Sequence, residues 1–276
     1  MSATKRGSLA AYPEPADHDA EQKFNQQYGD FTFPPVVLLI AAYNEEGAIG
    51  PVLDTVPRKI PGPDGTEVEV ATLVIVDGAT DRTAEIVAEH SDIYAHAYSK
   101  NRGHGAALRL GYHLAAGHGA EVVAITDADG QYEADQLAAL VGPILAGDAD
   151  FVNGSRRMGL EEADSRTRWL GVRFFATLAT ILTRTKLTDT SSGFRAMRTD
   201  TLMRVRLSEP QYHASQLLLG AMAEGARVKE VPVKMLLRKA GKSKKGHPIY
   251  YGYNYGRVMV TAWFRGWVLR RRGPGK

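Results

Sequence analysis

The chain has 276 residues, of which 44% are hydrophobic and 24% are charged, and its formal net charge is +3. This composition provides enough apolar residues for a sizeable core and excludes a disordered chain. Because the chain has no cysteine, disulfides, iron–sulfur clusters and thiolate zinc sites are excluded as well.

Strand and helix patterns alternate through the first half of the chain. Residues 1–34 are polar, contain several prolines and show no apolar periodicity, so we expect a flexible N-terminal arm. Continuous apolar runs predict buried strands, and apolar residues at helical spacing predict helices. In chain order we expect strands at 36–42, 72–76, 93–98, 121–127 and 150–153, and helices at 45–56, 81–90, 105–116 and 136–145. This alternation favours an α/β fold with a mostly parallel sheet.

The pattern changes after Gly154. We expect helices at 168–183, 217–224 and 258–269, and a strand at 227–237 that Pro232 interrupts. Accordingly, we divide the chain into the flexible arm (1–34), an α/β domain (35–245) and a basic, aromatic C-terminal helix and tail (246–276).

The basic residues are concentrated near the C-terminus. Residues 231–276 hold 12 Lys or Arg and no Asp or Glu, whereas residues 1–230 hold 22 basic and 31 acidic residues. An acidic body with a basic tail favours an anionic partner, such as a phosphate or a lipid surface. The alternative is that the charges form a solvated face.

Polar residues follow several of the predicted strands, where ligands bind in open parallel sheets. The clearest group is Asp127, Asp129 and Gln131. In an extended backbone, side chains at positions i, i+2 and i+4 share one face. Two carboxylates and an amide oxygen on one face predict a hard divalent cation, Mg²⁺ or Mn²⁺. The alternative is an ordinary Asp-rich turn, and an EF-hand fits poorly because its sixth position would be Tyr132.

A loop with two glycines, residues 101–105, precedes the predicted helix 105–116. Glycines allow a backbone to approach a ligand closely, and a helix N-terminus favours anions. The loop is not the dinucleotide-binding fingerprint, because Leu108 stands in place of the third glycine. On its own it is more often a simple turn.

Eight segments occur in a characteristic order. They are 41–46 (AAYNEE), 77–83 (DGATDRT), 101–105 (NRGHG), 127–131 (DADGQ), 154–156 (GSR), 189–195 (DTSSGFR), 230–233 (EVPV) and 238–244 (RKAGKSK). This ordered set resembles glycosyltransferase family 2, in the branch of the dolichol- and polyprenyl-phosphate mannosyltransferases. The similarity covers roughly residues 35–245.

The resemblance implies a GT-A fold, a GDP- or UDP-linked sugar donor, a divalent metal ion and inversion at the anomeric carbon. It implies that 35–245 is the catalytic domain and that Asp127, Asp129 and Gln131 hold the metal. Arg156 would meet an acceptor phosphate. The implied catalytic residues are Asp129, Arg156 and Gln216. The implied donor-site residues are Ala41, Tyr43, Glu45, Asp77, Gly103, Asp127, Ala128, Asp129, Arg195, Arg238, Ser243 and Lys244, of which Arg195, Arg238, Ser243 and Lys244 would close over the diphosphate or the acceptor.

Three positions depart from the family pattern. A second Asp that usually accompanies Asp77 is Val76, and His104 replaces a common Lys. Gln216 stands where a Glu often lies near the acceptor. A phosphate acceptor is already ionised and needs no base, so Gln216 favours a phosphate acceptor or else a damaged site. His213 is a candidate substitute base, although a lone His is more often structural.

From these observations we expect an enzyme that transfers a hexose from a nucleoside diphosphate to a polyprenyl phosphate. The alternatives are the same chemistry on a soluble acceptor such as a secondary metabolite, a sugar nucleotidyltransferase, or a non-enzymatic protein that binds a membrane surface. We expect no nucleic acid partner. With no apolar run near 18 residues and no signal peptide core, we expect a cytoplasmic protein. The helices at 168–183 and 258–269 would place it peripherally at the inner face of an anionic membrane, unless both helices simply pack on the sheet.

Overall fold

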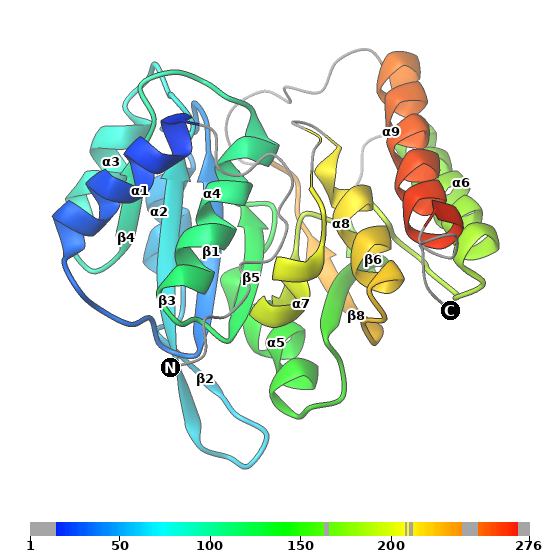
Figure 1. Cartoon of the computed structure of the whole chain (residues 1–276), viewed down its shortest axis with the longest axis horizontal. Coiled ribbons are helices and arrows are strands. Elements are labelled where there is room, and N and C mark those ends of the chain that lie inside the picture. Colours follow the sequence, from blue (N-terminus) through cyan, green and yellow to red (C-terminus); the bar gives the residue numbers. More distant parts are fainter. Residues whose placement is uncertain (1–14, 163–165, 208, 210–211, 239–247, 270–276) are drawn as a thin grey trace.

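The computed structural model describes residues 15–162, 166–207, 209, 212–238 and 248–269, in which helices cover both faces of a central sheet (Figure 1). The strands are β1 (Val36–Ala42), β2 (Lys59–Pro61), β3 (Glu67–Val76), β4 (Tyr94–Ala97), β5 (Val122–Asp127), β6 (Phe151–Glu161), β7 (Arg195–Arg198) and β8 (Val228–Met235). The α-helices are α1 (Pro15–Tyr28), α2 (Ile49–Thr55), α3 (Thr83–Glu89), α4 (His104–Gly117), α5 (Leu137–Leu145), α6 (Arg166–Thr183), α7 (Thr199–Arg204), α8 (His213–Ala223) and α9 (Pro248–Trp263). A 3₁₀ turn, η1 (Ala134–Gln136), precedes α5, and a π-helical segment, η2 (Phe264–Leu269), follows α9.

The sheet is parallel at its centre and mixed on one side. Its order is β2-β3-β1-β5-β7-β6-β8, and β4 pairs with β3. β1 runs parallel to both β3 and β5, and β6 runs parallel to β8. β7 is antiparallel to its neighbours β5 and β6. Because Ala41 is in register with both Ile75 and Asp127, the carboxyl ends of the three central strands meet at one edge.

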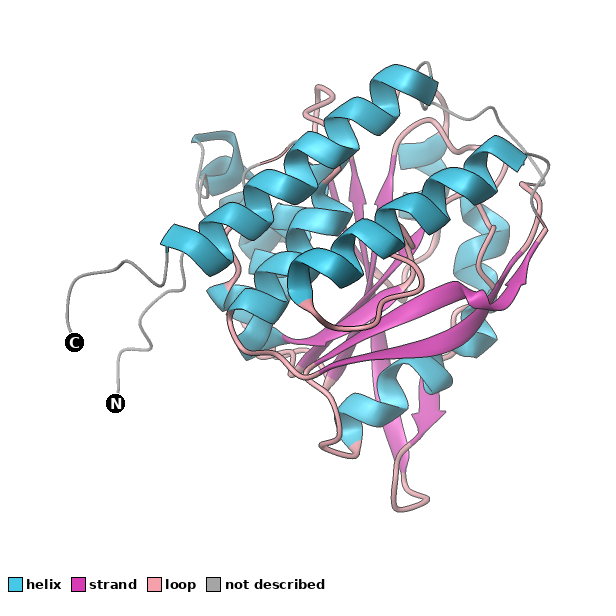
Figure 2. Cartoon of the chain, turned by 90° about the vertical axis from the view of Figure 1, so that its right-hand side faces the viewer, coloured by secondary structure: helices cyan, strands magenta, loops and turns pink. Residues whose placement is uncertain are grey.

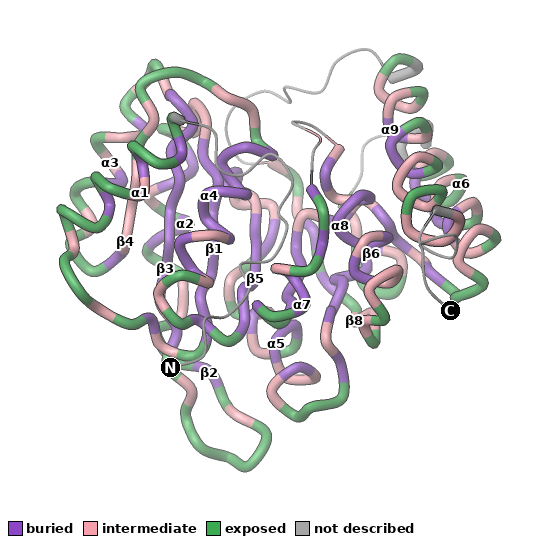
Figure 3. Tube along the Cα trace, viewed as in Figure 1, coloured by how far each residue is buried: buried purple, intermediate pink, exposed green. Residues whose placement is uncertain are grey.

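The central strands are buried on both faces, as the tube coloured by burial shows (Figure 3). All seven residues of β1 are buried. Val37 and Leu39 enter a core that includes α4 and α8, whereas Val36 and Leu38 enter a second core that includes α2 and α5. A strand covered on both faces needs apolar residues at every position, which explains the continuous apolar run of residues 36–42. The predicted central strand is therefore confirmed.

The N-terminal segment differs from the expectation of a flexible arm. Residues 15–28 form α1, which packs against α4 and β4. Ala20 and Phe24 are buried, and the ring of Phe24 lies 4.8 Å from that of Tyr28, centroid to centroid. These three residues are spaced four apart, a helical spacing that the polar residues between them conceal. The expectation is wrong for 15–28, and residues 1–14 lie outside the described residues.

Several elements in the second half are longer than the sequence predicts, and two were not predicted. β6 continues to Glu161, α9 begins at Pro248, and β7 and α7 are additional elements. β8 runs through Pro232 without interruption. Among the described strands β8 pairs only with β6, so Pro232 sits on an edge strand, where a missing N–H donor is tolerated. The predicted interruption is therefore wrong for the strand itself, although the pairing of β8 with β6 shifts register directly after Pro232.

Candidate active site

Asp77, directly after β3, fastens the glycine loop to the edge of the sheet. Its buried carboxylate accepts hydrogen bonds from the backbone N–H groups of Arg102 and Gly103, both at 2.8 Å, and from Asn101 Nδ2 at 3.1 Å. Gly78 has a φ of +64°, and a Cβ there would lie 2.2 Å from the backbone N of Asn101. A glycine is therefore needed for the two loops to approach. The structure thus brings the predicted residues Asp77 and Gly103 together at the start of α4.

A second group of predicted residues lies beyond β1 and β5. Arg238 Nη1 lies 3.3 Å from Glu45 Oε1, and Arg238 Nη2 donates to Asp129 Oδ2. Asp129 is 4% exposed. Burial raises the pKa of Asp129 to about 6, the charge of Asp127 raises it too, and the guanidinium of Arg238 opposes both. Three chain segments therefore meet at one charged cluster, although Asp129 and Arg238 are more than 100 residues apart in the sequence.

The three expected metal ligands do not share one extended face. β5 ends at Asp127, the following residues form a turn, and Gly130 has a φ of +70°. Gln131 donates from Nε2 to the carbonyl of Leu236 at 3.0 Å, while its backbone N–H binds Asp129 Oδ1. The expected i, i+2, i+4 arrangement is therefore wrong, because the backbone is not extended beyond Asp127. In the structure, the amide of Gln131 holds the end of β8.

Asp127 lies against Gly193, in the segment that leads into β7. A Cβ at Gly193 would lie 2.3 Å from Asp127 Oδ2, so this glycine allows the segment to pack on the carboxylate. Ala128, next in the chain, is buried in the core beneath α5. Because the side chain is buried, only the backbone of Ala128 is available to contact a nucleotide-sugar donor.

The carboxylates at the end of β5 fit a hard divalent cation. Among the described residues, no three His, Asp or Glu side chains are grouped closely enough to form a metal site on their own. Asp127 and Asp129 are nevertheless close enough for the charge of one to raise the pKa of the other. The guanidinium of Arg238 already provides a positive charge at Asp129. Carboxylate oxygens are the ligands that Mg²⁺ and Mn²⁺ prefer in proteins, and substrate oxygens complete the coordination.

Arg156, expected to meet an acceptor phosphate, is buried in an internal ion pair. Its guanidinium binds Asp189 through Nε at 2.6 Å and Nη2 at 2.8 Å, and Nη2 also donates to Ser191 at 2.7 Å. Nη1 lies 3.7 Å from Glu161, and the Arg156 side chain is 2% exposed. Burial alone would raise the pKa of Asp189, but the charge of Arg156 lowers it below its usual value. In the structure, Arg156 therefore lies in an internal ion pair and not on the surface where an acceptor was expected.

Arg195 and Gln216 are also engaged inside the protein. Arg195 is fully buried and donates to the main-chain carbonyls of Thr190, Ser192 and Ala214. It therefore ties the loop before β7 to the start of α8 and does not reach the charged cluster, contrary to the expectation. Gln216 is 6% exposed, and its Oε1 accepts a hydrogen bond from the backbone N of Glu209 at 3.2 Å.

The remaining predicted residues are placed by the same strand ends. Ala41 is buried at the end of β1, and Tyr43 follows it in a half-buried position. Ser243 and Lys244 lie outside the described residues.

Sequence reasoning missed Asp17, which links α1 to the glycine loop. Asp17 is 4% exposed, accepts a hydrogen bond from the hydroxyl of Tyr98 at 2.6 Å, and forms an ion pair with Arg102. The guanidinium of Arg102 also lies over the ring of Tyr98. No local pattern marks Asp17, because its partners lie more than 80 residues away.

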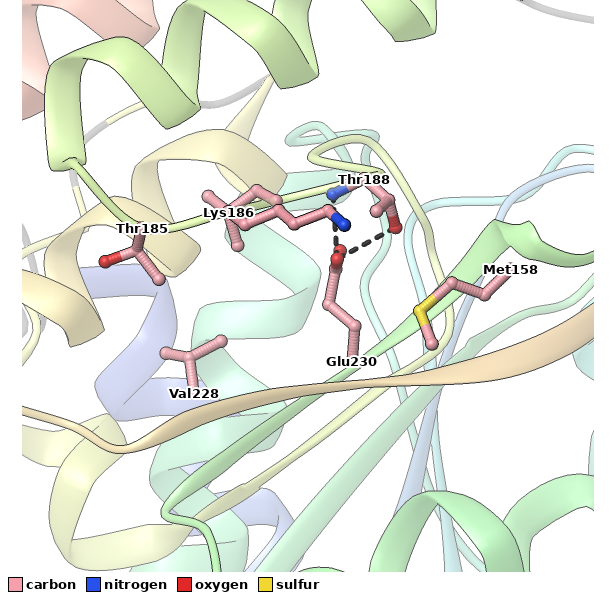
Figure 4. Close-up of a pocket in the computed structure, with 7 residues that line it drawn as sticks. Met158, Thr185, Lys186, Thr188, Val228 and Glu230 are labelled. Atoms are coloured by element: carbon pink, nitrogen blue, oxygen red, sulfur yellow. Dashed lines mark hydrogen bonds between the residues drawn. The ribbon is translucent and has the colours of Figure 1, made fainter.

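A pocket of about 270 Å³ lies between β6, β8 and the segment after α6 (Figure 4). Glu230 points into it and accepts hydrogen bonds from Thr188 N at 2.7 Å and Thr188 Oγ1 at 2.8 Å. The other carboxylate oxygen binds Asp189 N and Asn153 Nδ2. None of the sequence-predicted site residues lines this pocket. Glu230 thus anchors the segment that carries Asp189.

Similarity to known proteins covers most of the chain. The family model described as Glycosyl transferase family 2 matches residues 37–206. A dolichyl-phosphate hexose transferase of Haloferax volcanii is 31% identical over 215 residues, covering 78% of this chain and 88% of that protein. An undecaprenyl-phosphate mannosyltransferase of Micrococcus luteus is 28% identical over 237 residues, covering 83% and 93%.

Among solved structures, the chain is similar to glucosyl-3-phosphoglycerate synthase from Mycobacterium tuberculosis, in a complex with Mn²⁺, UDP and glucosyl-3-phosphoglycerate. The TM-score is 0.62 at 17% identity, and the match covers 84% of this chain and 80% of that one. This likeness confirms the GT-A fold expected from the sequence.

Proposed function

This chain belongs to glycosyl transferase family 2 and is a glycosyltransferase; from this premise we propose that it moves a hexose from a nucleoside diphosphate to a polyprenyl phosphate. The proposal includes a divalent cation and inversion at the anomeric carbon. The observation that carries it is the meeting of Glu45, Asp129 and Arg238 beyond the central strands. The similarity to two enzymes named for dolichyl and undecaprenyl phosphate supports the acceptor class.

The donor would bind along the carboxyl ends of β1, β3 and β5. Asp77 holds the glycine loop through three hydrogen bonds, so the start of α4 is fixed before a ligand arrives. Such preorganisation reduces the free energy lost on ordering the site. Tyr43 and Glu45, which follow β1, would contact the donor there.

The diphosphate would replace part of the Glu45–Asp129–Arg238 cluster. Asp127 and Asp129 would hold Mg²⁺ or Mn²⁺, which, when bound, neutralises charge on the leaving diphosphate. Arg238 already carries a guanidinium into this position, and guanidinium groups bind phosphate oxygens in a bidentate manner. These charges stabilise the transition state more than the ground state, because the diphosphate gains negative charge as the glycosidic bond breaks.

A phosphate acceptor suits the residues near α8. A phosphate oxygen attacks the anomeric carbon, the bond from that carbon to the diphosphate breaks, and the bonding electrons leave with the nucleoside diphosphate. The attacking oxygen is ionised at neutral pH, so no proton has to be removed. Gln216 is a neutral amide that already accepts a hydrogen bond from the backbone, which suits a reaction without a base.

The acceptor would be met at a membrane surface. No helix among the described residues is both long and apolar enough to cross a bilayer. α6 and α9 lie side by side over the sheet (Figure 2). Each buries one side, including Ala179 and Met259, yet Phe174 and Ile181 are 63% and 69% exposed. Exposed apolar side chains on paired amphipathic helices favour insertion at a lipid interface.

The test is a transfer assay with sugar-labelled GDP-mannose, UDP-glucose and UDP-N-acetylglucosamine, each with undecaprenyl phosphate and Mn²⁺. We expect one donor to yield a labelled product that partitions into organic solvent, with release of the nucleoside diphosphate. EDTA should abolish the product. Release of pyrophosphate would instead identify a nucleotidyltransferase and overturn the proposal.

A soluble acceptor is the second candidate, because the similar solved structure holds glucosyl-3-phosphoglycerate. A parallel assay with 3-phosphoglycerate separates the two. A labelled product in the aqueous phase, with none in the lipid phase, would favour the soluble acceptor.

A further inference from the structure

Arg238 contacts the buried carboxylate that the proposed function gives to a metal ion. Its Nη2 donates to Asp129 Oδ2, and its Nη1 lies 3.3 and 3.4 Å from the two carboxylate oxygens of Glu45. The side chains of Asp129 and Glu45 are only 6% and 10% exposed. In the structure, the guanidinium of Arg238 therefore covers Oδ2 of Asp129.

Both oxygens of Asp129 have protein partners, and the two partners differ in their freedom to move. Oδ1 accepts the backbone N–H of Gln131 at 3.1 Å, and this N–H is fixed by the turn after β5. Oδ2 binds Arg238, whose guanidinium stands at the end of a long side chain with several rotatable bonds. A metal ion that binds Oδ2 would meet this guanidinium, and two cations at such a distance repel each other. Arg238 is therefore the partner that has to move.

The backbone that carries Arg238 is anchored on both sides. Leu236 N donates to the carbonyl of Gln131 at 2.8 Å, and Gln131 Nε2 donates to the carbonyl of Leu236 at 3.0 Å. Leu237 N donates to Glu162 Oε2 at 3.1 Å, just beyond the end of β6. Because the backbone is held in this way, the guanidinium changes partner by rotation of its side chain alone.

The protein supplies few metal ligands of its own, so the diphosphate has a part in this exchange. No three His, Asp or Glu side chains of the described residues are grouped closely enough to hold a metal ion. A divalent cation at Asp127 and Asp129 therefore depends on phosphate oxygens for the rest of its coordination. Guanidinium groups bind phosphate oxygens through charged, bidentate hydrogen bonds. A diphosphate thus brings a new partner for Arg238 and further ligands for the cation at the same time.

We propose that Arg238 holds the place of the divalent cation at Asp129 until a nucleoside diphosphate draws its guanidinium away. The proposal rests on the proposed transferase function but concerns a separate property, the coupling between metal and diphosphate binding. Before the exchange, Arg238 balances the charge of Asp129, since an unpaired buried charge is strongly destabilising. After it, the diphosphate and the metal ion each strengthen the binding of the other by the same factor.

The direct test measures the binding of Mn²⁺ alone and of a nucleoside diphosphate alone, without turnover. Free Mn²⁺ is followed by its EPR signal, and UDP and GDP are titrated by calorimetry in EDTA. Arg238→Gln should bind Mn²⁺ about tenfold more tightly, because the competing cation is gone. It should bind the preferred diphosphate about tenfold more weakly, because a charged hydrogen bond is lost. A merely structural ion pair predicts instead that its loss weakens both.

Two further variants serve as controls. Arg238→Lys keeps the positive charge and should bind Mn²⁺ as weakly as the unsubstituted protein does. Arg227→Gln removes a comparable ion pair at the other end of β8, where Arg227 Nη2 lies 2.8 Å from Asp150 Oδ1. This variant should leave both affinities unchanged.

A measurement on the unsubstituted protein covers the case in which Arg238→Gln fails to fold. In protein labelled with ¹⁵N-arginine, the guanidinium signal of Arg238, assigned with Arg238→Lys, should shift when the diphosphate is added in EDTA, while that of Arg227 stays in place. If the Arg238 signal stays in place while the diphosphate binds, or if Arg238→Gln binds Mn²⁺ no more tightly than the unsubstituted protein, the proposal is overturned. Either result would leave the transferase function intact, because the labelled product of the transfer assay tests it separately.

Discussion

The two sides of the sheet use their charged residues in different ways. Beyond β1, β3 and β5, the carboxylate of Asp77 binds the glycine loop and that of Asp129 binds the guanidinium of Arg238. Among β6, β7 and β8, the cations Arg156 and Arg195 lie inside the protein with protein partners. On both sides a buried charge joins segments that are far apart in the sequence, so the comparison teaches that charge alone does not mark a ligand site.

The antiparallel strand β7 accounts for the difference. It is inserted between β5 and β6, and the segment that leads into it brings Asp189 against Arg156 and Gly193 against Asp127. The charge of Arg156 is thereby balanced by Asp189 inside the protein. Buried charges of this kind need complete pairing, because an unpaired one is strongly destabilising.

The largest expected effect is on stability, from breaking the internal ion pair. Arg156→Met should lower the free energy of unfolding by about 3–5 kcal/mol, because Asp189 stays buried without its partner. Urea denaturation measures this effect. The double variant Arg156→Met/Asp189→Leu should recover part of the loss. If the single variant unfolds like the unsubstituted protein but loses activity, Arg156 serves a ligand after all.

The next effect is on catalysis at the other side of the sheet. Asp129→Asn should reduce kcat about 10²- to 10³-fold, since an amide cannot balance the charge of the cation and diphosphate. Asp135→Asn, at an exposed carboxylate in η1, is the matched control and should retain full activity. Comparable activity of both variants in the transfer assay would remove Asp129 from the site.

The pH profile should report the same carboxylate. The pKa of Asp129 is raised to about 6, so the ionised form that binds a cation is lost as the pH falls through about 6. We expect kcat/KM at limiting Mn²⁺ to fall roughly fivefold between pH 6 and pH 5. An acid limb near pH 4, the usual range of an Asp, would show that this carboxylate does not control the profile.

The sequence predicted the central strands and the residues that follow them, because buried parallel strands have continuous apolar runs and polar ends. It did not predict the turn after Asp127, which depends on Gly130, nor the fate of Arg156, whose partner lies 33 residues away. It also missed α1, whose short apolar stripe is dispersed among polar residues. Local patterns therefore predicted the central strands, while the pairing between distant charges came only from the tertiary structure.

A smaller effect should link the N-terminal helix to the donor edge. Asp17→Asn weakens the ion pair with Arg102, so the glycine loop loses one of its supports while Asp77 still holds it. We expect the donor KM to rise up to about tenfold with little change in kcat, the usual size of a lost charged hydrogen bond. Asp19→Asn, at an exposed position on the same helix, is the control. Equal donor KM values for the two variants would show that α1 does not position the loop.

The smallest effect should be at the exposed face of α6. The substitutions are made in α6 and not in α9, because Val258 and Met259 of α9 are buried in the fold. Phe174→Ser/Ile181→Ser changes only exposed positions, so the melting temperature should stay the same. Each substitution removes part of the apolar contact with lipid, so co-sedimentation with anionic vesicles should fall. Unchanged sedimentation would show that this face of α6 does not bind lipid, and the two sides of the sheet would then differ only in their interior charges.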